Sequence, residues 1–194
     1  LEGWRSVNDL GGGYLFLHGA PVLSAVWAVL GRAALGKVTV EAHAEAAAPG
    51  LYDCPKRLRI VWRFEAPALE LVWEQGDTPP RKQPGDARFE GEKGAFALTC
   101  CDGAMTAPPE VMAAGDPKYL PLSPMDEWYR RMALRDAALF GIEDACRVSA
   151  LCALGHLACR LGRPIEWDET TGMLASGDPA QILLAPAERG PWRY

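Results

Sequence analysis

The sequence has few histidines, no long apolar run and no excess of basic residues, and each shortage excludes a class of protein. Only three of its 194 residues are histidine, and we find no nucleophile elbow, Ser-His-Asp order or phosphate-binding P-loop. The net charge of −5 gives no basic surface of the kind that binds nucleic acid. No stretch reaches the roughly 18 uninterrupted apolar residues of a membrane span. We therefore expect no nucleic-acid partner and no membrane insertion.

Two further absences concern the start of the chain. It begins at Leu1 without a methionine, and no signal peptide is visible. We expect a fragment of a longer protein with a cytoplasmic location. The length of 194 residues fits one domain, and the content of 49% hydrophobic and 23% charged residues is typical of a globular protein with a real core.

Six cysteines are present, and three of them lie inside one apolar segment. Cysteines on a buried helix are more often small packing residues than a disulfide framework, so we interpret them as reduced. Cys152, His156 and Cys159 have a spacing that could supply three zinc ligands on one helix face. No fourth ligand is evident and the neighbouring residues are apolar. We therefore expect no metal here.

The helix predictions begin with three consecutive glycines, Gly11 to Gly13. Glycine tolerates left-handed backbone and close contacts, so this triplet predicts a bend. An apolar segment follows, in which Pro21 suits the first position of a helix because its missing N–H costs nothing there. We predict a buried helix from near Ala20 to Gly31, which would be its C-terminal cap.

Two more helices are predicted in the second half of the chain. The residues Ser-Pro-Met-Asp at 123–126 form an N-terminal cap, and the helix should reach about Leu139. Its inner stripe would be Met125, Trp128, Met132 and Leu139. The next helix, residues 142–161, is apolar on almost all sides and ends at Gly162, so we expect it to pack centrally against a sheet.

Arginines gather on the first of these two helices, at Arg130, Arg131 and Arg135. They could clamp a carboxylate. Acidic residues of the same segment neutralise them, however, and we interpret the cluster as a solvated face.

Alternating apolar and charged residues predict the strands. Residues 37–45 form a half-buried strand, and segments 57–65 and 68–75 fix each other's register across a tight turn at Ala66-Pro67. The predicted cross-strand pairs are Arg63 with Glu70, Arg59 with Glu74, Trp62 with Leu71 and Ile60 with Trp73. A hairpin is predicted around 91–94 and a last strand at 165–168.

These elements predict an α+β fold, with a mostly antiparallel open sheet of five to eight strands. The helices near 20–31, 124–139 and 142–161 would pack on one face of this sheet. Its other face would carry charges of both signs from Glu41, Arg59, Arg63, Glu70 and Glu74. Such a face is either solvated or a polar interface.

Several of these motifs together resemble the carboxy-terminal domain of the Gfo/Idh/MocA family of NAD(P)-dependent oxidoreductases. The matching segments are the glycines Gly11, Gly12, Gly13 and Gly19 with Trp27 and Gly31, the hairpin Phe-x-Gly-Glu-Lys-Gly-x-Phe at 89–96, the Ile-Glu-Trp-Asp at 165–168, the Asp-Pro-Ala at 178–180 and the Trp-Arg at 192–193. The resemblance implies a single substrate-binding and oligomerisation domain over residues 1–194, without the amino-terminal Rossmann domain. It also implies homo-oligomers that form through the open sheet face.

The activity implied by this resemblance is hydride transfer between NAD(P) and a hydroxyl of a sugar or cyclitol. A dinucleotide site needs a Gly-x-Gly-x-x-Gly turn, and Phe16 stands where the third glycine would be. We therefore expect this chain to bind no cofactor and to be inactive alone, with NAD(P) bound by the rest of a longer parent. A sugar-like small molecule is the expected ligand.

Site residues follow from the same resemblance. Where the family has Asp, His and Asp, this chain has Leu17, Pro21 and Ser24, and the nearest imidazole is His18. His18 is the candidate catalytic residue because an imidazole suits proton transfer near neutral pH, and the alternative is a loop histidine held by local backbone. The glycines at 11–13 and at 19 are candidate substrate-binding residues. The three substitutions favour a second interpretation, a non-catalytic relative that serves as a binding or assembly module.

Overall fold

The computed structural model describes residues 3–30, 36–45, 47, 50–76, 86–92, 94–99, 105–106, 124–138 and 140–185. The chain divides into two compact units. The first joins Leu1–Gly19, Ala33–Asp77 and Ser149–Tyr194, and the second joins Ala20–Arg32 and Thr78–Val148. The expectation of one domain over residues 1–194 stays a prediction.

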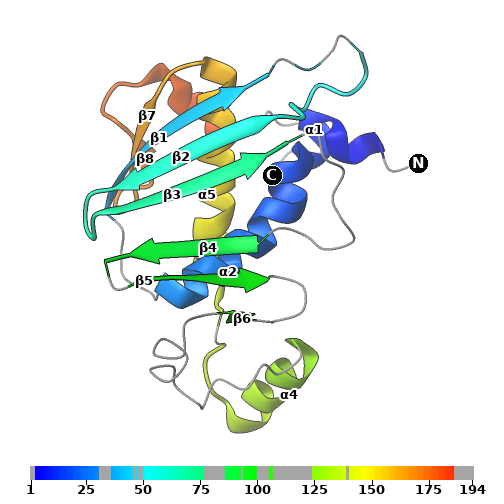
Figure 1. Ribbon diagram of the computed structural model, residues 1–194, viewed down its shortest axis with the longest axis vertical. Coiled ribbons are helices and arrows are strands. Elements are labelled where there is room, and N and C mark those ends of the chain that lie inside the picture. Colours follow the sequence, from blue (N-terminus) through cyan, green and yellow to red (C-terminus); the bar gives the residue numbers. More distant parts are fainter. Residues whose placement is uncertain are drawn as a thin grey trace. The chain divides into compact units, whose positions relative to one another are not determined.

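A five-stranded sheet forms the centre of the first unit (Figure 1). Its strand order is β3-β2-β1-β7-β8, and neighbouring strands pair antiparallel throughout. The strands are β1 (Lys37–Ala44), β2 (Leu58–Phe64), β3 (Leu69–Gln75), β7 (Ile165–Asp168) and β8 (Met173–Leu174). The pairing of β1 with β7 brings strands from the first and the last quarter of the chain into one sheet. The predicted α+β fold with an open antiparallel sheet is confirmed.

The β2–β3 hairpin has the register that the sequence predicts. Arg63 lies opposite Glu70, Arg59 opposite Glu74, Trp62 opposite Leu71 and Ile60 opposite Trp73. A slip by one residue would send every apolar side chain of β2 to the charged face, so burial of one face fixes the pairing. Both tryptophans belong to the buried stripe, as predicted, and are 0% and 8% exposed.

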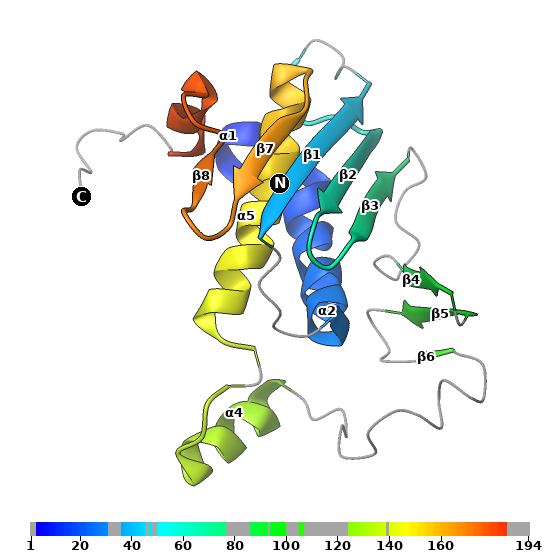
Figure 2. The same cartoon turned by 90° about the vertical axis from the view of Figure 1, so that its left-hand side faces the viewer.

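Helices cover one face of this sheet (Figure 2). They are the part of α5 (Ile142–Leu161) that begins at Ser149, together with α1 (Asn8–Gly11) and the turns before and after it. The Trp62 indole Nε1 donates to the carbonyl oxygen of Leu151 at 3.1 Å, which satisfies a polar atom inside the core. A Cβ on Gly155 would lie 2.7 Å from Ile60 Cδ1, so glycine lets the helix backbone approach the strand.

The core of the first unit lies between this sheet and these helices. Its most deeply buried side chains are Leu15, Val40, Ile60, Trp62, Cys152, Leu154 and Ile165. On the opposite face of the sheet, charged side chains surround Val61, which is only 1% exposed. Gly162, with φ +61°, ends α5 as predicted, because its N–H reaches back to Ala158 and Cys159.

The second unit contains a three-stranded antiparallel sheet in the order β4-β5-β6. Its elements are α2 (Ala20–Leu30), β4 (Asp86–Gly91), β5 (Gly94–Thr99), β6 (Met105–Thr106), α4 (Pro124–Leu134) and the first turns of α5. The predicted hairpin around 91–94 is confirmed as β4–β5. The guanidinium of Arg147 lies 5.7 Å from the ring centre of Trp27, a cation–π contact.

The structure differs from the sequence prediction in the lead-in and in the start of the first predicted helix. Besides the five-stranded sheet, the described strands form the second sheet β4-β5-β6. Residues 3–11, for which the sequence analysis predicts no element, form the 3₁₀ turn Gly3–Ser6 (η1) and α1. Helical backbone also begins at Gly13, well before Ala20, and passes through a π-helical turn, Leu15–Gly19 (η2), into α2. Pro21 thus follows a π turn, whose wider winding accommodates a residue without an N–H.

The predicted inner stripe of residues 124–139 is also wrong. Met125, Trp128 and Met132 of α4 are 54%, 53% and 52% exposed, and Leu139 lies outside the described residues. The helix ends at Leu134, earlier than predicted, because Arg135 takes a left-handed conformation with φ +51°. In the described part of the chain, no helix has both the length and the apolar character needed to cross a membrane.

Candidate functional site

The glycine triplet makes the turn between α1 and the π-helical segment. Gly12 and Gly13 have φ of +66° and +76°, which favours glycine at both positions. A Cβ on Gly13 would lie 2.8 Å from Cys54 Cβ, and one on Gly11 would lie 2.7 Å from Arg5 Cα. Packing within the protein therefore accounts for the triplet. Its assignment to substrate binding stays a prediction, as does that of Gly19, where Leu15 fills the space beside the backbone.

His18 lies on the π-helical turn, one turn after Tyr14. The ring centres of Tyr14 and His18 are 4.3 Å apart with the planes tilted by 34°, and Tyr14 is 6.3 Å from the ring of Trp73 on β3. His18 is half-buried. Three rings from two distant segments thus form an aromatic cluster, Tyr14, His18 and Trp73, with the imidazole at one end.

Burial lowers the pKa of His18, and the positive charge of Arg5 lowers it further. The imidazole is therefore neutral at pH 7 and suited to accept a proton rather than donate one. Burial raises the pKa of Tyr14, so its hydroxyl stays protonated at the same pH. The catalytic role of His18 stays a prediction.

Loop 50–55 anchors the segment that carries these rings. The backbone N–H of Asn8 donates to Asp53 Oδ1 at 2.7 Å, and the Cys54 thiol donates to Asn8 Oδ1 at 3.2 Å. Burial raises the pKa of Cys54 to about 11, so this thiol acts as a hydrogen-bond donor and not as a nucleophile.

Gln75 holds Trp73 in place beside Tyr14. Its side-chain oxygen accepts from the indole Nε1 of Trp73 at 3.1 Å, and its amide donates to the carbonyl oxygens of Pro55 and Lys56 at 2.9 and 3.2 Å. The same glutamine lines a shallow cavity of about 520 Å³ at the end of β1, β2 and β3, which is open to solvent and has mostly exposed lining residues. Its lining consists of His43, Ala44, Glu45, Arg57, Leu58, Arg59, Glu74, Gln75 and Gly76.

The three positions that are polar in the family hold no competent base here. Leu17 is 39% exposed, Pro21 has no titratable group, and the Ser24 hydroxyl donates to the carbonyl oxygen of Ala20 at 2.8 Å in its own helix. His18 is thus the candidate for proton transfer in this segment.

Cys152, His156 and Cys159 lie on the part of α5 that faces the first unit's core. Cys152 Sγ is 3.9 Å from the carbonyl oxygen of Leu15, and burial raises the pKa of this thiol to about 12. His156 makes an edge contact with Phe16 at 6.0 Å, and burial lowers its pKa. Within the described residues, no group of three His, Cys, Asp or Glu could hold a metal ion. That the chain binds no metal remains a prediction.

Arg131 of the arginine cluster is engaged by acidic neighbours. It pairs with Glu127 at 2.5 Å and also with Asp136. Arg130 and Arg135 are exposed. This arrangement agrees with the predicted solvated face.

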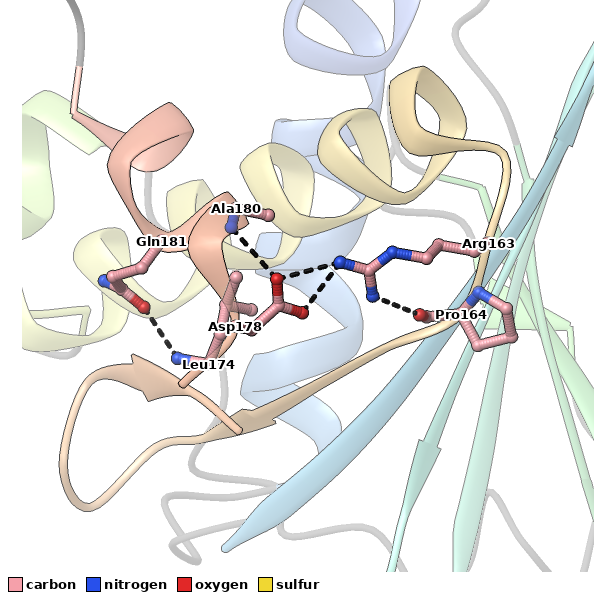
Figure 3. Close-up of polar contacts among 6 residues, drawn as sticks. All are labelled: Arg163, Pro164, Leu174, Asp178, Ala180 and Gln181. Carbon is pink, nitrogen blue, oxygen red and sulfur yellow. Dashed lines mark hydrogen bonds and ion pairs between the residues drawn. The ribbon is translucent and has the colours of Figure 1, made fainter. Parts of the chain in front are cut away.

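The Asp-Pro-Ala motif near the end of the chain is a structural clasp (Figure 3). One terminal nitrogen of Arg163 lies 2.8 and 2.9 Å from the two carboxylate oxygens of Asp178. Asp178 also accepts from the N–H of Ala180 and so caps the 3₁₀ turn Pro179–Leu184 (η3). Gln181 accepts from the N–H of Leu174, which ties this turn to β8.

Comparison with known proteins connects this arrangement to solved structures. No protein-family model and no curated protein matches the sequence. The structure is similar to that of an aldose-aldose oxidoreductase from Caulobacter crescentus complexed with glycerol, with a TM-score of 0.58 and 17% identity over 83% of this chain and 50% of that chain. An NAD-binding protein from Listeria innocua gives a TM-score of 0.55 and 16% identity over 83% of this chain and 53% of that one.

The chain therefore has the same fold as part of each of these two proteins. It spans about half the length of these two structural neighbours. The resemblance drawn from the sequence motifs is thereby confirmed for the fold, since identities this low carry no more than that.

Sequence reasoning missed Tyr14, Trp73 and Gln75 as parts of the site. The spacing of Tyr14 and His18 was a usable signal, because residues four apart on a helix lie on one face. The contact between Tyr14 and Trp73 joins positions 59 residues apart, and the hydrogen bonds of Gln75 reach back 20 and 19 residues to Pro55 and Lys56, so no local pattern in the sequence indicates them.

Proposed function

We propose that the chain is the substrate-binding domain of an NAD(P)-dependent sugar or cyclitol oxidoreductase and is not catalytic by itself. The observation that carries the proposal is the likeness to an aldose-aldose oxidoreductase and to an NAD-binding protein, over about half the length of each. The neutral imidazole of His18, held against Tyr14, fits the base that such a reaction requires. NAD(P) would be bound by another part of a longer parent, which supplies the hydride acceptor.

Dinucleotide titration tests this proposal. Calorimetry with NAD⁺ and NADP⁺ should show no binding to this chain, because Phe16 breaks the glycine pattern that a pyrophosphate-binding turn needs. An absorbance assay with a panel of sugars should likewise show no turnover by the chain alone. Micromolar binding of either dinucleotide would contradict the proposal.

A second candidate function is a binding or assembly module that has lost catalysis. It is favoured by Leu17, Pro21 and Ser24, none of which can act as a base. The substitution His18→Ala in a longer parent protein separates the two. Loss of turnover with unchanged sugar affinity would assign catalysis to His18, whereas a parent without turnover before the substitution would favour the module.

The open face of the five-stranded sheet is the proposed surface for homo-oligomers. Arg63 pairs with Glu41 at 2.7 Å and with Glu70 at 3.0 Å, and the hydrogen bond from Arg63 lowers the pKa of Glu41. A face of paired charges favours polar association that salt weakens. Sizing at low and high salt should give a dimer that dissociates as salt rises, and a monomer under both conditions would contradict the proposal.

A further inference from the structure

The cavity at the end of β1, β2 and β3 has a polar wall that the proposed reaction does not use. β1 and β3 end beside this cavity, and β2 begins there (Figure 1). Three lining residues, His43, Arg59 and Glu74, occupy one row across the three strands. All of the lining belongs to the first unit.

Arg59 is held in a way that leaves its outer nitrogens available. Its Nε donates to Glu74 Oε1 at 3.0 Å, and among the described residues we find no partner for its two terminal nitrogens. A carboxylate on Nε fixes the plane of the guanidinium, and the terminal nitrogens then form a planar fork suited to two oxygens of one anion.

The rest of the wall supplies one more donor and few free acceptors. His43 lies opposite Arg59 in the strand pair and makes no hydrogen bond within the described part of the chain. Glu45 is paired with Arg57 at 3.1 Å, and the oxygen of Gln75 accepts from Trp73. Each carboxylate of the lining therefore faces a guanidinium, whereas Arg59 and His43 have donors that meet no acceptor in the ranges that the structure describes.

We propose that this cavity binds the oxyanion group of a small molecule, a carboxylate or a phosphate. The terminal nitrogens of Arg59 and the imidazole of His43 would hold the oxyanion. The volume of about 520 Å³ leaves room for the rest of a ligand of monosaccharide size. The site is separate from the aromatic cluster and adjoins it through Gln75.

Calorimetric titration at constant ionic strength tests the proposal with three probes: inorganic phosphate, gluconate and sorbitol. Phosphate and gluconate present the two oxyanions, and sorbitol is a neutral polyol of the same length as gluconate. We expect one or both anions to bind and sorbitol to bind much more weakly. Equal binding of gluconate and sorbitol, or no binding of either anion, would overturn the proposal.

Substitution locates the site. Arg59→Gln should lower the affinity for the anion by about tenfold or more, because it removes the charged guanidinium. The matched control is Arg63→Gln, four residues along the same strand face, where the arginine already pairs with two carboxylates and does not line the cavity. It should change anion affinity by less than about twofold. Equal losses from both variants would indicate a general charge effect and would contradict this site.

The result does not depend on the oxidoreductase proposal. Anion binding that Arg59→Gln removes, in a chain that binds no sugar, would support this site and count against the proposed function. Sizing of the same samples identifies any variant that changes assembly, since both arginines lie on the open sheet face. A variant that misfolds is recognised by its amide NMR spectrum, and Arg59→Lys then replaces Arg59→Gln, with a loss of anion affinity still expected because lysine lacks the fork.

Discussion

Helices α4 and α5 are neighbours in the sequence, and both carry apolar residues at helical spacing, yet their burial differs. From Ser149 onward α5 buries Leu151, Cys152 and Leu154 in the first unit. Trp128 and Met132 of α4 are more than half exposed. Apolar residues at helical spacing thus predict that a helix forms, but they do not predict that its apolar side chains are buried. Burial also requires a matching apolar surface elsewhere in the protein.

The largest expected effect contrasts two tryptophans, one in each environment. Trp62→Ala should lower the free energy of unfolding by about 3–5 kcal/mol, because it opens a cavity and leaves the Leu151 carbonyl without its indole donor. Trp128→Ala should change it by less than about 0.5 kcal/mol, since that side chain is 53% exposed. Urea denaturation measures both. Similar losses would mean that α4 is covered in solution.

A smaller loss of stability is expected from two Gly→Ala substitutions in turns of the first unit, and comparing them separates backbone strain from packing. Gly13→Ala should cost about 1–3 kcal/mol, because φ is +76° and the new Cβ would meet Cys54. Gly172→Ala is the matched control, with φ +67° and nothing within 4 Å of the new Cβ. It should cost about 1 kcal/mol from strain alone. Equal losses in urea denaturation would show that Cys54 moves aside.

The clasp between Arg163 and Asp178 should make stability depend on pH. The hydrogen bond from the Ala180 N–H lowers the pKa of Asp178, and the bond from Arg163 lowers it further. A carboxyl whose pKa is lower in the folded state stabilises the protein above its unfolded pKa, and this contribution is lost as pH falls through the folded pKa. In thermal unfolding, Asp178→Asn should therefore have a lower midpoint temperature than the wild type near pH 7. The difference between the two midpoints should shrink toward pH 2. A constant difference over this range would contradict the ionic origin.

The smallest effect concerns His18. NMR titration should give a pKa below the ordinary histidine value of about 6.5, because burial and then Arg5 lower it. Arg5→Gln should raise the pKa of His18 slightly toward that value, because it removes the nearby positive charge. A pKa of His18 above that value would contradict the arrangement seen around Tyr14.

Local patterns predicted most of the fold. The register of β2 and β3 followed from alternation on both faces, and the end of α5 followed from Gly162. The exposure of α4 and the early helix start at Gly13 were missed. The exposure of the α4 side chains depends on which other parts of the chain pack against them. The π-helical turn before Pro21 depends on a local backbone geometry that no residue type predicts.

The candidate site was predictable only in part. The segment with the glycine triplet and His18 was identified from the sequence, as was the absence of a competent base at Leu17, Pro21 and Ser24. The contact of Tyr14 with Trp73 and the hydrogen bonds of Gln75 to loop 50–55 and Lys56 depend on contacts across the fold. The cavity beside Gln75 likewise arises from three strand ends that only pairing brings together.

The proposed function places a sugar-like ligand, and not a dinucleotide, beside His18. The direct measurement is two-dimensional NMR of the ring signals of His18 and Tyr14 while sugars and cyclitols are added, with NAD⁺ added to a parallel sample. We expect saturable shifts of the His18 and Tyr14 signals with at least one sugar or cyclitol and none with NAD⁺. Saturable shifts with NAD⁺, or no shift with any member of a broad sugar and cyclitol panel, would contradict it.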